Sequence, residues 1–215
     1  MITSGAPAHR FEHLLREAVA DAASVLDIGT SQRFAKELSP YRALLTGHGY
    51  RAAGFRPEPM GADTCDLDLD VQAISLPDDS EDCVLCLEVL EHVADPFRAA
   101  RELVRIIRPG GRLLLTVPFL TSYHGKGDTP DHAGYPDFWR FTHQGLEHLF
   151  ASLDELQVHA VTGPVEARLR FMKIDRLLDA FPTRQLLDRI DRPVAGRMTN
   201  RHIVAGRKKP PGDIA

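Results

Sequence analysis

Side chains that could do chemistry are concentrated in residues 120–141. This segment combines proton-transfer groups with aromatic and cationic groups that can hold a ligand: Tyr123, His124, Asp128, Asp131, His132, Tyr135, Asp137, Trp139 and Arg140. A histidine removes a proton from a hydroxyl near neutral pH, and a carboxylate can orient its ring. His124 or His132 is therefore our candidate general base, with Asp131 as the residue that orients it.

Other interpretations of this loop stay open. His124, Asp131 and His132 could bind a metal ion, but a metal needs at least three ligands in a fixed geometry, and we expect none here. Trp139 and Arg140 could be structural, because tryptophan buries a large area and arginine pairs with nearby acids. A loop of this length is usually functional when it is ordered, so we expect substrate contacts. The candidates are Tyr123, Tyr135, Asp137, Trp139 and Arg140.

An α/β framework must position these residues. The apolar runs at 82–87 and 112–117 are typical of strands covered on both faces. A helix from Pro96 joins them, so they form a parallel βαβ unit. Further strands are predicted at residues 24–28, 50–55, 65–70, 156–161 and 201–206, and further helices at 7–22, 33–45, 142–150 and 166–191. The sequence thus predicts a doubly wound, mostly parallel seven-stranded sheet with helices on both faces.

In such a sheet, ligands bind outside the carboxyl ends of the strands. Several motifs follow the predicted strands. They read VLDIG at 25–29, D-VQA-ISLPDDSED at 70–82, LEHVADP at 90–96, RPGGRLLLTVPF at 108–119 and PDFWRFTHQGLEHLF at 136–150. Together they resemble the class I S-adenosylmethionine-dependent methyltransferases, over roughly residues 20–162. The resemblance implies a Rossmann-like fold and S-adenosylmethionine as the cofactor.

The resemblance also implies cofactor contacts at the strand ends. Asp27 would orient the first loop, and Gly29 would let that loop approach the methionine moiety. Asp70 would accept a hydrogen bond from the adenine amino group, while Val71 would pack on the ring. Leu87 and Glu88 would close over the cofactor.

Two positions depart from the family pattern. Ser31 stands where the first loop usually has a second glycine, so it is the remaining candidate cofactor contact. Gly54 stands where an acid usually binds the ribose hydroxyls. Glu58 or Asp63 could replace that acid, and the two departures put the affinity for the cofactor in question.

The resemblance implies methyl transfer to a small-molecule acceptor, at a hydroxyl of a sugar or secondary metabolite. In-line displacement requires the protein mainly to align nucleophile, methyl carbon and sulfur. The alternative is a binding or scaffold protein that kept the fold with weak or no turnover. A nucleic-acid modifier ranks last, because the chain lacks a basic groove with interleaved aromatics.

Length and composition predict one domain over the 215 residues. Within it we expect an N-terminal helix at 1–22, an acceptor loop at 120–141, a helical insertion at 166–198 and a tail at 207–215. The net charge of −4 hides a basic last quarter, where residues 165–215 hold 12 Lys and Arg against 6 Asp and Glu. Its basic helix face, with Arg168, Lys173 and Arg176, is either a solvated surface or a contact for an anionic group.

The expected setting is cytoplasmic. The three cysteines are odd in number, which favours a reducing compartment, and Cys83 and Cys86 are expected in the core. The chain lacks an apolar run long enough to cross a bilayer, so we expect no integral membrane contact. A homodimer is compatible with the apolar spacing of the last helices, and no nucleic-acid partner is expected.

Overall fold

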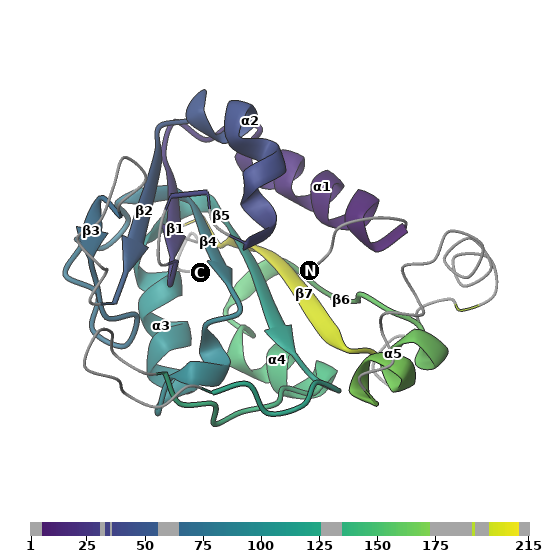
Figure 1. The fold of residues 1–215 in the computed structure, drawn as a ribbon. Helices are drawn as coiled ribbons and strands as arrows, with labels where there is room; N and C mark the ends of the chain where they lie inside the picture. The colour runs from purple at the N-terminus through teal and green to yellow at the C-terminus, as the bar shows by residue number, and fades with distance from the viewer. Residues whose placement is uncertain are drawn as a thin grey trace, which may run out of the picture.

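A computed structural model describes residues 6–30, 33–34, 36–55, 65–125, 135–172, 191 and 198–210. Its centre is a seven-stranded sheet in the order β3-β2-β1-β4-β5-β7-β6 (Figure 1). The strands are β1 (Val25–Ile28), β2 (Tyr50–Gly54), β3 (Leu67–Asp68), β4 (Glu81–Leu87), β5 (Ile107–Pro118), β6 (Leu153–Ala160) and β7 (Arg201–Lys208). The first five pair in parallel, and β7 runs antiparallel to both β5 and β6. The predicted fold class is confirmed.

Helices cover both faces of the sheet (Figure 1). The α-helices are α1 (Ala6–Val19), α2 (Arg42–Thr46), α3 (Pro96–Ile106), α4 (His143–Leu149) and α5 (Pro164–Phe171), and two short 3-10 helices are η1 (Lys36–Tyr41) and η2 (Leu90–His92). Residues of α1 and α2 pack with one face of the sheet, and residues of α3 and α4 with the other. Because side chains alternate along a strand, Cys83 and Cys86 fall into opposite cores, and both are fully buried. This confirms their expected core position.

Local signals start the helices as the sequence predicts. The Asp95 side chain accepts a hydrogen bond from the N–H of Arg98 at 2.9 Å, and Pro96 follows in the first turn of α3. The Thr142 hydroxyl accepts from the N–H of Gly145 at 3.1 Å and begins α4. Both caps satisfy N–H groups that a helix leaves without a partner.

Several boundaries differ from those predicted. Strand β5 begins at Ile107 and not at residue 112, because Ile107 already pairs with Glu81 of β4. The pairing is irregular between Ile107 and Arg112, where Gly110 has a positive φ of 79°. Strand β3 is shorter than its alternating pattern indicates. Strand β7 extends to Lys208, so residues 207 and 208, which were expected in the tail at 207–215, belong to the sheet. The ammonium of Lys208 donates to the carboxylate of Asp79 at 2.6 Å.

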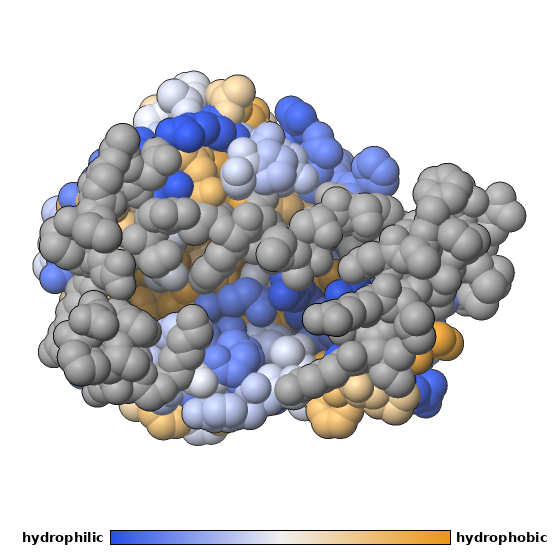
Figure 2. Space-filling model, viewed as in Figure 1, coloured by the Kyte–Doolittle hydropathy of each residue, from blue (hydrophilic) through white to orange (hydrophobic). Residues whose placement is uncertain are grey.

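The expected helical insertion at 166–198 is described in part. Helix α5 begins at Pro164, two residues earlier than expected, and exposes Arg168. Lys173 and Arg176 lie outside the described residues, as does the rest of the insertion except Asp191 and residue 198. Figure 2 shows one face of the molecule, on which apolar residues are visible across the middle with hydrophilic residues directly below them.

Candidate active site

The loop after β1 is held by a hydrogen-bonded chain of side chains. Asp27 is buried, and its Oδ2 accepts from the Tyr50 hydroxyl at 2.7 Å. The same hydroxyl accepts from the N–H of Phe34 at 3.0 Å, and the rings of Phe34 and Tyr50 stack at 4.2 Å. Burial, aided by the nearby Asp27 carboxylate, raises the pKa of Tyr50, which therefore stays a donor. Asp27 thus reaches the loop through Tyr50, a residue that the sequence analysis missed.

Gly29 is required by its neighbours in the fold. It has a φ of 82°, and its N–H donates to the carbonyl of Ala53 at 2.8 Å. A Cβ at this position would lie 2.2 Å from Cγ2 of Val89. The close approach that the glycine permits is therefore made by Val89 within the protein. Ser31, the other candidate in this loop, lies outside the described residues.

Gly54 is the last residue of β2 and pairs with Asp68 of β3. The nearby Asp66 carboxylate is occupied by the backbone N–H of Ala52 at 2.8 Å and by an ion pair with Arg33. The two substitutes that we considered, Glu58 and Asp63, lie outside the described residues.

Asp70 is held rigidly by its own turn. Its Oδ1 accepts from the N–H of Gln72 at 2.8 Å, and its carbonyl accepts from the N–H of Ala73 at 2.9 Å. Across the described part of the chain, Oδ2 makes no hydrogen bond. The carboxylate can therefore keep its turn and still accept one bond from a ligand. Val71 is buried within the core.

The end of β4 is strained. Glu88 has a φ of 55°, a left-handed conformation that is uncommon for residues other than glycine. Its N–H donates to the carbonyl of Thr116 at 2.9 Å, and its carboxylate lies 3.4 Å from the guanidinium of Arg201. Leu87 just before it is buried. Such strain is often found at functional sites.

An ion pair organises the loop after β5, which we define as residues 119–125 and 135–142. Arg140 donates to both carboxylate oxygens of Asp137 and to the carbonyls of Thr121 at 2.9 Å and Ser122 at 3.1 Å. The Asp137 side chain is fully buried, and it also accepts from the N–H of His124 at 2.9 Å. The Arg140 guanidinium lowers the pKa of Asp137 to about 2. The pair therefore fixes the position of His124.

The aromatic residues of this loop divide into two kinds. The indole N–H of Trp139 donates to the carbonyl of Val93 at 2.8 Å, which anchors the loop to the segment after η2. Tyr123 and Phe138 are well exposed. Tyr135 packs edge-on against the ring of His92 at 4.8 Å. Trp139 thus makes a structural contact, whereas substrate binding by Tyr123 and Tyr135 stays a prediction.

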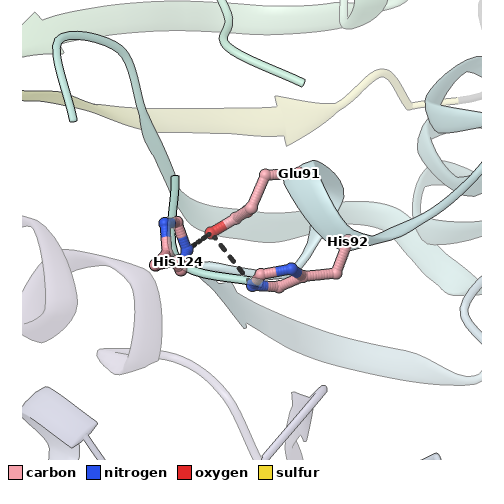
Figure 3. Close-up of side chains that lie close together, drawn as sticks. All are labelled: Glu91, His92 and His124. Atoms are coloured by element: carbon pink, nitrogen blue, oxygen red, sulfur yellow. Dashed lines mark ion pairs between the residues drawn. The ribbon is translucent and has the colours of Figure 1, made fainter. Parts of the chain in front are cut away.

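Glu91 lies between the rings of His92 and His124 (Figure 3). Its Oε1 lies 3.6 Å from Nε2 of His92 and 3.7 Å from Nε2 of His124. The Glu91 side chain is completely buried, yet neither of its oxygens has a hydrogen-bond partner within the described chain. The Glu91 carboxylate, aided by the Ser122 carbonyl and by Asp137, raises the pKa of His124.

The sequence analysis missed Glu91 as a site residue. Glu91 precedes His92 directly, and this acid–histidine pair was the available signal, but no spacing rule links it to His124. The other members of the expected proton-transfer set, Asp131 and His132, lie outside the described residues. Of that set, the structure thus places only His124.

The described sheet, with helices on both faces, is a Rossmann-like fold, and the candidate site lies at the carboxyl ends of its strands. Residues 26–115 match the family model described as a methyltransferase domain. The match runs from β1 into β5 and supports assigning this part of the chain to such a domain.

Two curated relatives share about half of this chain. An uncharacterized 37.1 kDa protein in a transposon of Streptomyces fradiae is 34% identical over 104 residues, which are 48% of this chain and 26% of that protein. An uncharacterized methyltransferase of Mycobacterium sp. (strain KMS) is 32% identical over 108 residues, 46% of this chain and 40% of its own. The matches thus span two fifths or less of these relatives.

Solved structures share the fold at low sequence identity. The cyclase SpnF has a TM-score of 0.54 at 16% identity, covering 94% of this chain and 81% of its own. A Haemonchus contortus phosphoethanolamine N-methyltransferase in complex with S-adenosyl-L-methionine has a TM-score of 0.54 at 15% identity, covering 94% of this chain and 52% of its own. None of the described helices is long and apolar enough to cross a membrane.

Proposed function

We propose that this protein transfers the methyl group of S-adenosylmethionine to a hydroxyl of a small-molecule acceptor. The observation that supports the proposal most is the methyltransferase-domain match, which covers the strand ends at Asp27, Asp70 and Glu88. Asp70 suits the cofactor in particular, because one of its oxygens holds its turn while the other is available to an adenine amino group.

The loop after β5 supports an acceptor that must lose a proton. Glu91, His92 and His124 gather at the carboxyl ends of β4 and β5, and Tyr123, which precedes His124 in the sequence, is exposed. A hydroxyl needs deprotonation to be a strong nucleophile, and polar groups gathered in one place can provide it. The raised pKa of His124 favours its protonated form, which weakens its expected role as the general base.

A binding or scaffold protein without turnover is the second candidate. It is favoured by Gly54, which leaves the end of β2 without the usual ribose-binding acid. Formation of S-adenosylhomocysteine with any acceptor distinguishes the two candidates.

The first test is calorimetric titration of the full chain with S-adenosylmethionine, comparing Asp70→Asn with Asp70→Ala. Asparagine keeps the acceptor for the Gln72 N–H and replaces only the available oxygen by an amide NH₂ group. We expect both variants to bind the cofactor about 10- to 100-fold more weakly, because a lost hydrogen bond to a charged group is worth about 1.5–3 kcal/mol. Only the alanine variant should also lose stability.

Each outcome of this titration has a distinct meaning. Unchanged cofactor affinity in both variants would exclude Asp70 as the adenine acceptor. Absence of binding by the unmodified protein would overturn the proposed cofactor. Binding without S-adenosylhomocysteine formation across a panel of hydroxyl and amine acceptors would favour the scaffold function.

A further inference from the structure

The carboxylate of Glu91 is buried, and its nearest polar groups among the described residues are two imidazoles that lie beyond hydrogen-bond distance. Its side chain is 0% exposed, and both oxygens are without a hydrogen bond from any described residue. A charge in the interior is normally paired, hydrogen-bonded or bound to a metal, because burying it alone is costly. The two imidazoles nearby are too far from Oε1 for good hydrogen bonds, at 3.6 and 3.7 Å. A small cation between the three groups would fit this spacing.

The two histidines are oriented as metal ligands would be. Nδ1 of His92 lies in hydrogen-bond contact with the carbonyl of Pro136, and Nδ1 of His124 lies 3.3 Å from the carbonyl of Ser122. A carbonyl can only accept, so Nδ1 of His92 carries the proton. Nδ1 of His124 also lies 3.4 Å from the Asp137 carboxylate and 3.5 Å from the Arg140 guanidinium, and the two nearer acceptors favour the proton on this nitrogen. Each Nε2 then presents its lone pair toward Glu91 when the ring is neutral. Metal-bound histidines are usually held in this way by a second hydrogen bond.

The three ligand atoms are close enough to share one ion. They all lie within 4.8 Å of one another. Metal–ligand bonds of about 2.1 Å place ligands about 3.0–3.4 Å apart, so small side-chain rotations would close the site. Glu91 is buried, but the His124 side chain is 35% exposed and gives the site access to solvent.

We propose that Glu91, His92 and His124 bind one divalent transition-metal ion. Two imidazoles and one carboxylate suit Zn²⁺, Mn²⁺, Fe²⁺ or Co²⁺, whereas Mg²⁺ and Ca²⁺ prefer oxygen ligands. The sequence analysis expected no metal and considered only a different set, of which His124 is the one common member. The site therefore depends on Glu91 and His92, which lie on η2 and were not recognised as ligands.

Three protein ligands leave coordination positions for the acceptor, and this step rests on the proposed methyl transfer. An acceptor hydroxyl bound to the ion loses its proton to water more readily, because the cation stabilises the alkoxide. The alkoxide oxygen then forms a bond to the methyl carbon as the carbon–sulfur bond breaks. The bonding electrons stay on sulfur, which becomes the neutral thioether. This role would remove the need for His124 to act as a base.

The test is titration of the EDTA-stripped full chain with Zn²⁺ and with Co²⁺. We expect one equivalent to bind, with a Co²⁺ absorption spectrum typical of mixed nitrogen and oxygen ligands. Glu91→Gln, His92→Gln and His124→Gln should each weaken metal binding by about 100-fold or more. Loss of a residue that only hydrogen-bonds to a metal ligand costs about 10- to 100-fold in affinity, and loss of the ligand itself should cost at least as much. The matched control is His148→Gln, which changes an exposed histidine outside the cluster and should bind as the unmodified protein does.

Two results would overturn the site. One is absence of stoichiometric binding of either metal, and the other is metal binding that all three variants retain. Folding of each variant is checked by circular dichroism, and Glu91→Gln is close to isosteric. Calorimetry with S-adenosylmethionine on the same samples separates the two proposals. Cofactor binding with no metal binding refutes the metal site alone, whereas metal binding with no cofactor binding refutes the proposed function and keeps the site.

Discussion

The two halves of the strand-end edge satisfy their polar groups in different ways. Around β1 and β2, the buried Asp27 carboxylate is bonded by Tyr50, which is itself bonded by the backbone of Phe34. Around β4, β5 and β7, Glu91 and the fully buried His202 have side-chain nitrogen or oxygen atoms without a hydrogen bond from the residues that the structure describes. In the first half, the buried carboxylate of Asp27 is hydrogen-bonded by the protein itself. In the second half, buried side-chain atoms of the described residues have no hydrogen-bond partner within the protein.

This difference indicates in which half a ligand would supply hydrogen bonds or metal coordination that the protein itself does not. Most buried polar groups in native proteins are satisfied, so exceptions require an explanation such as a bound ion or a catalytic role. The β1–β2 half would bind a ligand on a preformed surface. The β4–β5 half would be completed by its ligand. The four changes below test this contrast, from the largest expected effect to the smallest.

Gly29→Ala should cause the largest loss of stability, in the preformed half. The new Cβ would overlap Cγ2 of Val89 and would force alanine to adopt a φ of 82°. Strain of about 1–2 kcal/mol from the left-handed backbone and about 1–3 kcal/mol from overpacking predict a loss of about 2–5 kcal/mol in the free energy of unfolding. Urea denaturation measures it. Combining Gly29→Ala with Val89→Ala should cost less than the two separate losses together, and strictly additive losses would contradict the overlap.

His202 should make the second half sensitive to acid. Burial, aided by the nearby His143, lowers the pKa of His202 from its ordinary value of 6.5 to about 4. Between these values the unfolded chain binds a proton that the folded protein excludes, so this stability is complete above pH 6.5 and is lost as the pH falls toward 4. At 1.36 kcal/mol per pKa unit, the loss is about 3 kcal/mol.

The measurement is the free energy of unfolding at several pH values, for the unmodified protein and for His202→Phe. The variant should show a shallower decline between pH 6.5 and pH 4, while the exposed control His148→Gln should keep the original slope. Equal slopes in the unmodified protein and His202→Phe would show that His202 does not set the acid sensitivity.

The Asp27–Tyr50 hydrogen bond should be measurable as a coupling between two changes. Asp27→Ala leaves the buried Tyr50 hydroxyl without this acceptor, and Tyr50→Phe removes the donor, so each should reduce the free energy of unfolding by about 1–3 kcal/mol. The double variant should lose less than both losses combined, by about 0.5–3 kcal/mol. Independent effects in this double-mutant cycle would mean that the first half is not organised by this bond.

Glu91→Met should have the smallest effect and the opposite sign. In the EDTA-treated protein, methionine removes two buried oxygens without hydrogen bonds and keeps a similar volume. Replacing buried charges by apolar groups is often neutral or stabilising, so we expect a gain of about 1 kcal/mol. Thermal and urea denaturation measure it. A loss as large as that of Asp27→Ala would show that the two halves are built alike.

The fold could be predicted from signals that lie within a few consecutive residues, because these signals do not require contacts between distant segments. Apolar runs identified β4 and β5, and Asp95 and Thr142 marked the beginnings of α3 and α4. The boundaries were less well determined. Residues 107–111 carry a Pro-Gly-Gly turn signal, but pairing between Glu81 and Ile107 draws them into β5. A hydrogen bond between distant strands decides such an end, and no local pattern reports it.

The candidate site was predicted in its location and only in part in its residues. Asp27 lies near the end of β1, and Gly29, Asp70 and Glu88 come within two residues of the ends of their strands. The topology alone therefore brings them to one edge of the sheet. Arg140 and Asp137 are three residues apart, and their pairing could be anticipated from arginine chemistry. Ser31, Asp131 and His132 lie outside the described residues, so their roles stay predictions.

The sequence by itself determined the order of strands and helices along the chain, the side of each that faces the core, and the edge of the sheet at which a ligand is expected. These properties follow from periodicity, caps and connection rules, which act over a few residues. Only the tertiary structure placed Tyr50 against Asp27, and His124 beside Glu91 and His92. The reason is physical: the register between strands and the path of the loop after β5 depend on contacts between segments far apart in the chain.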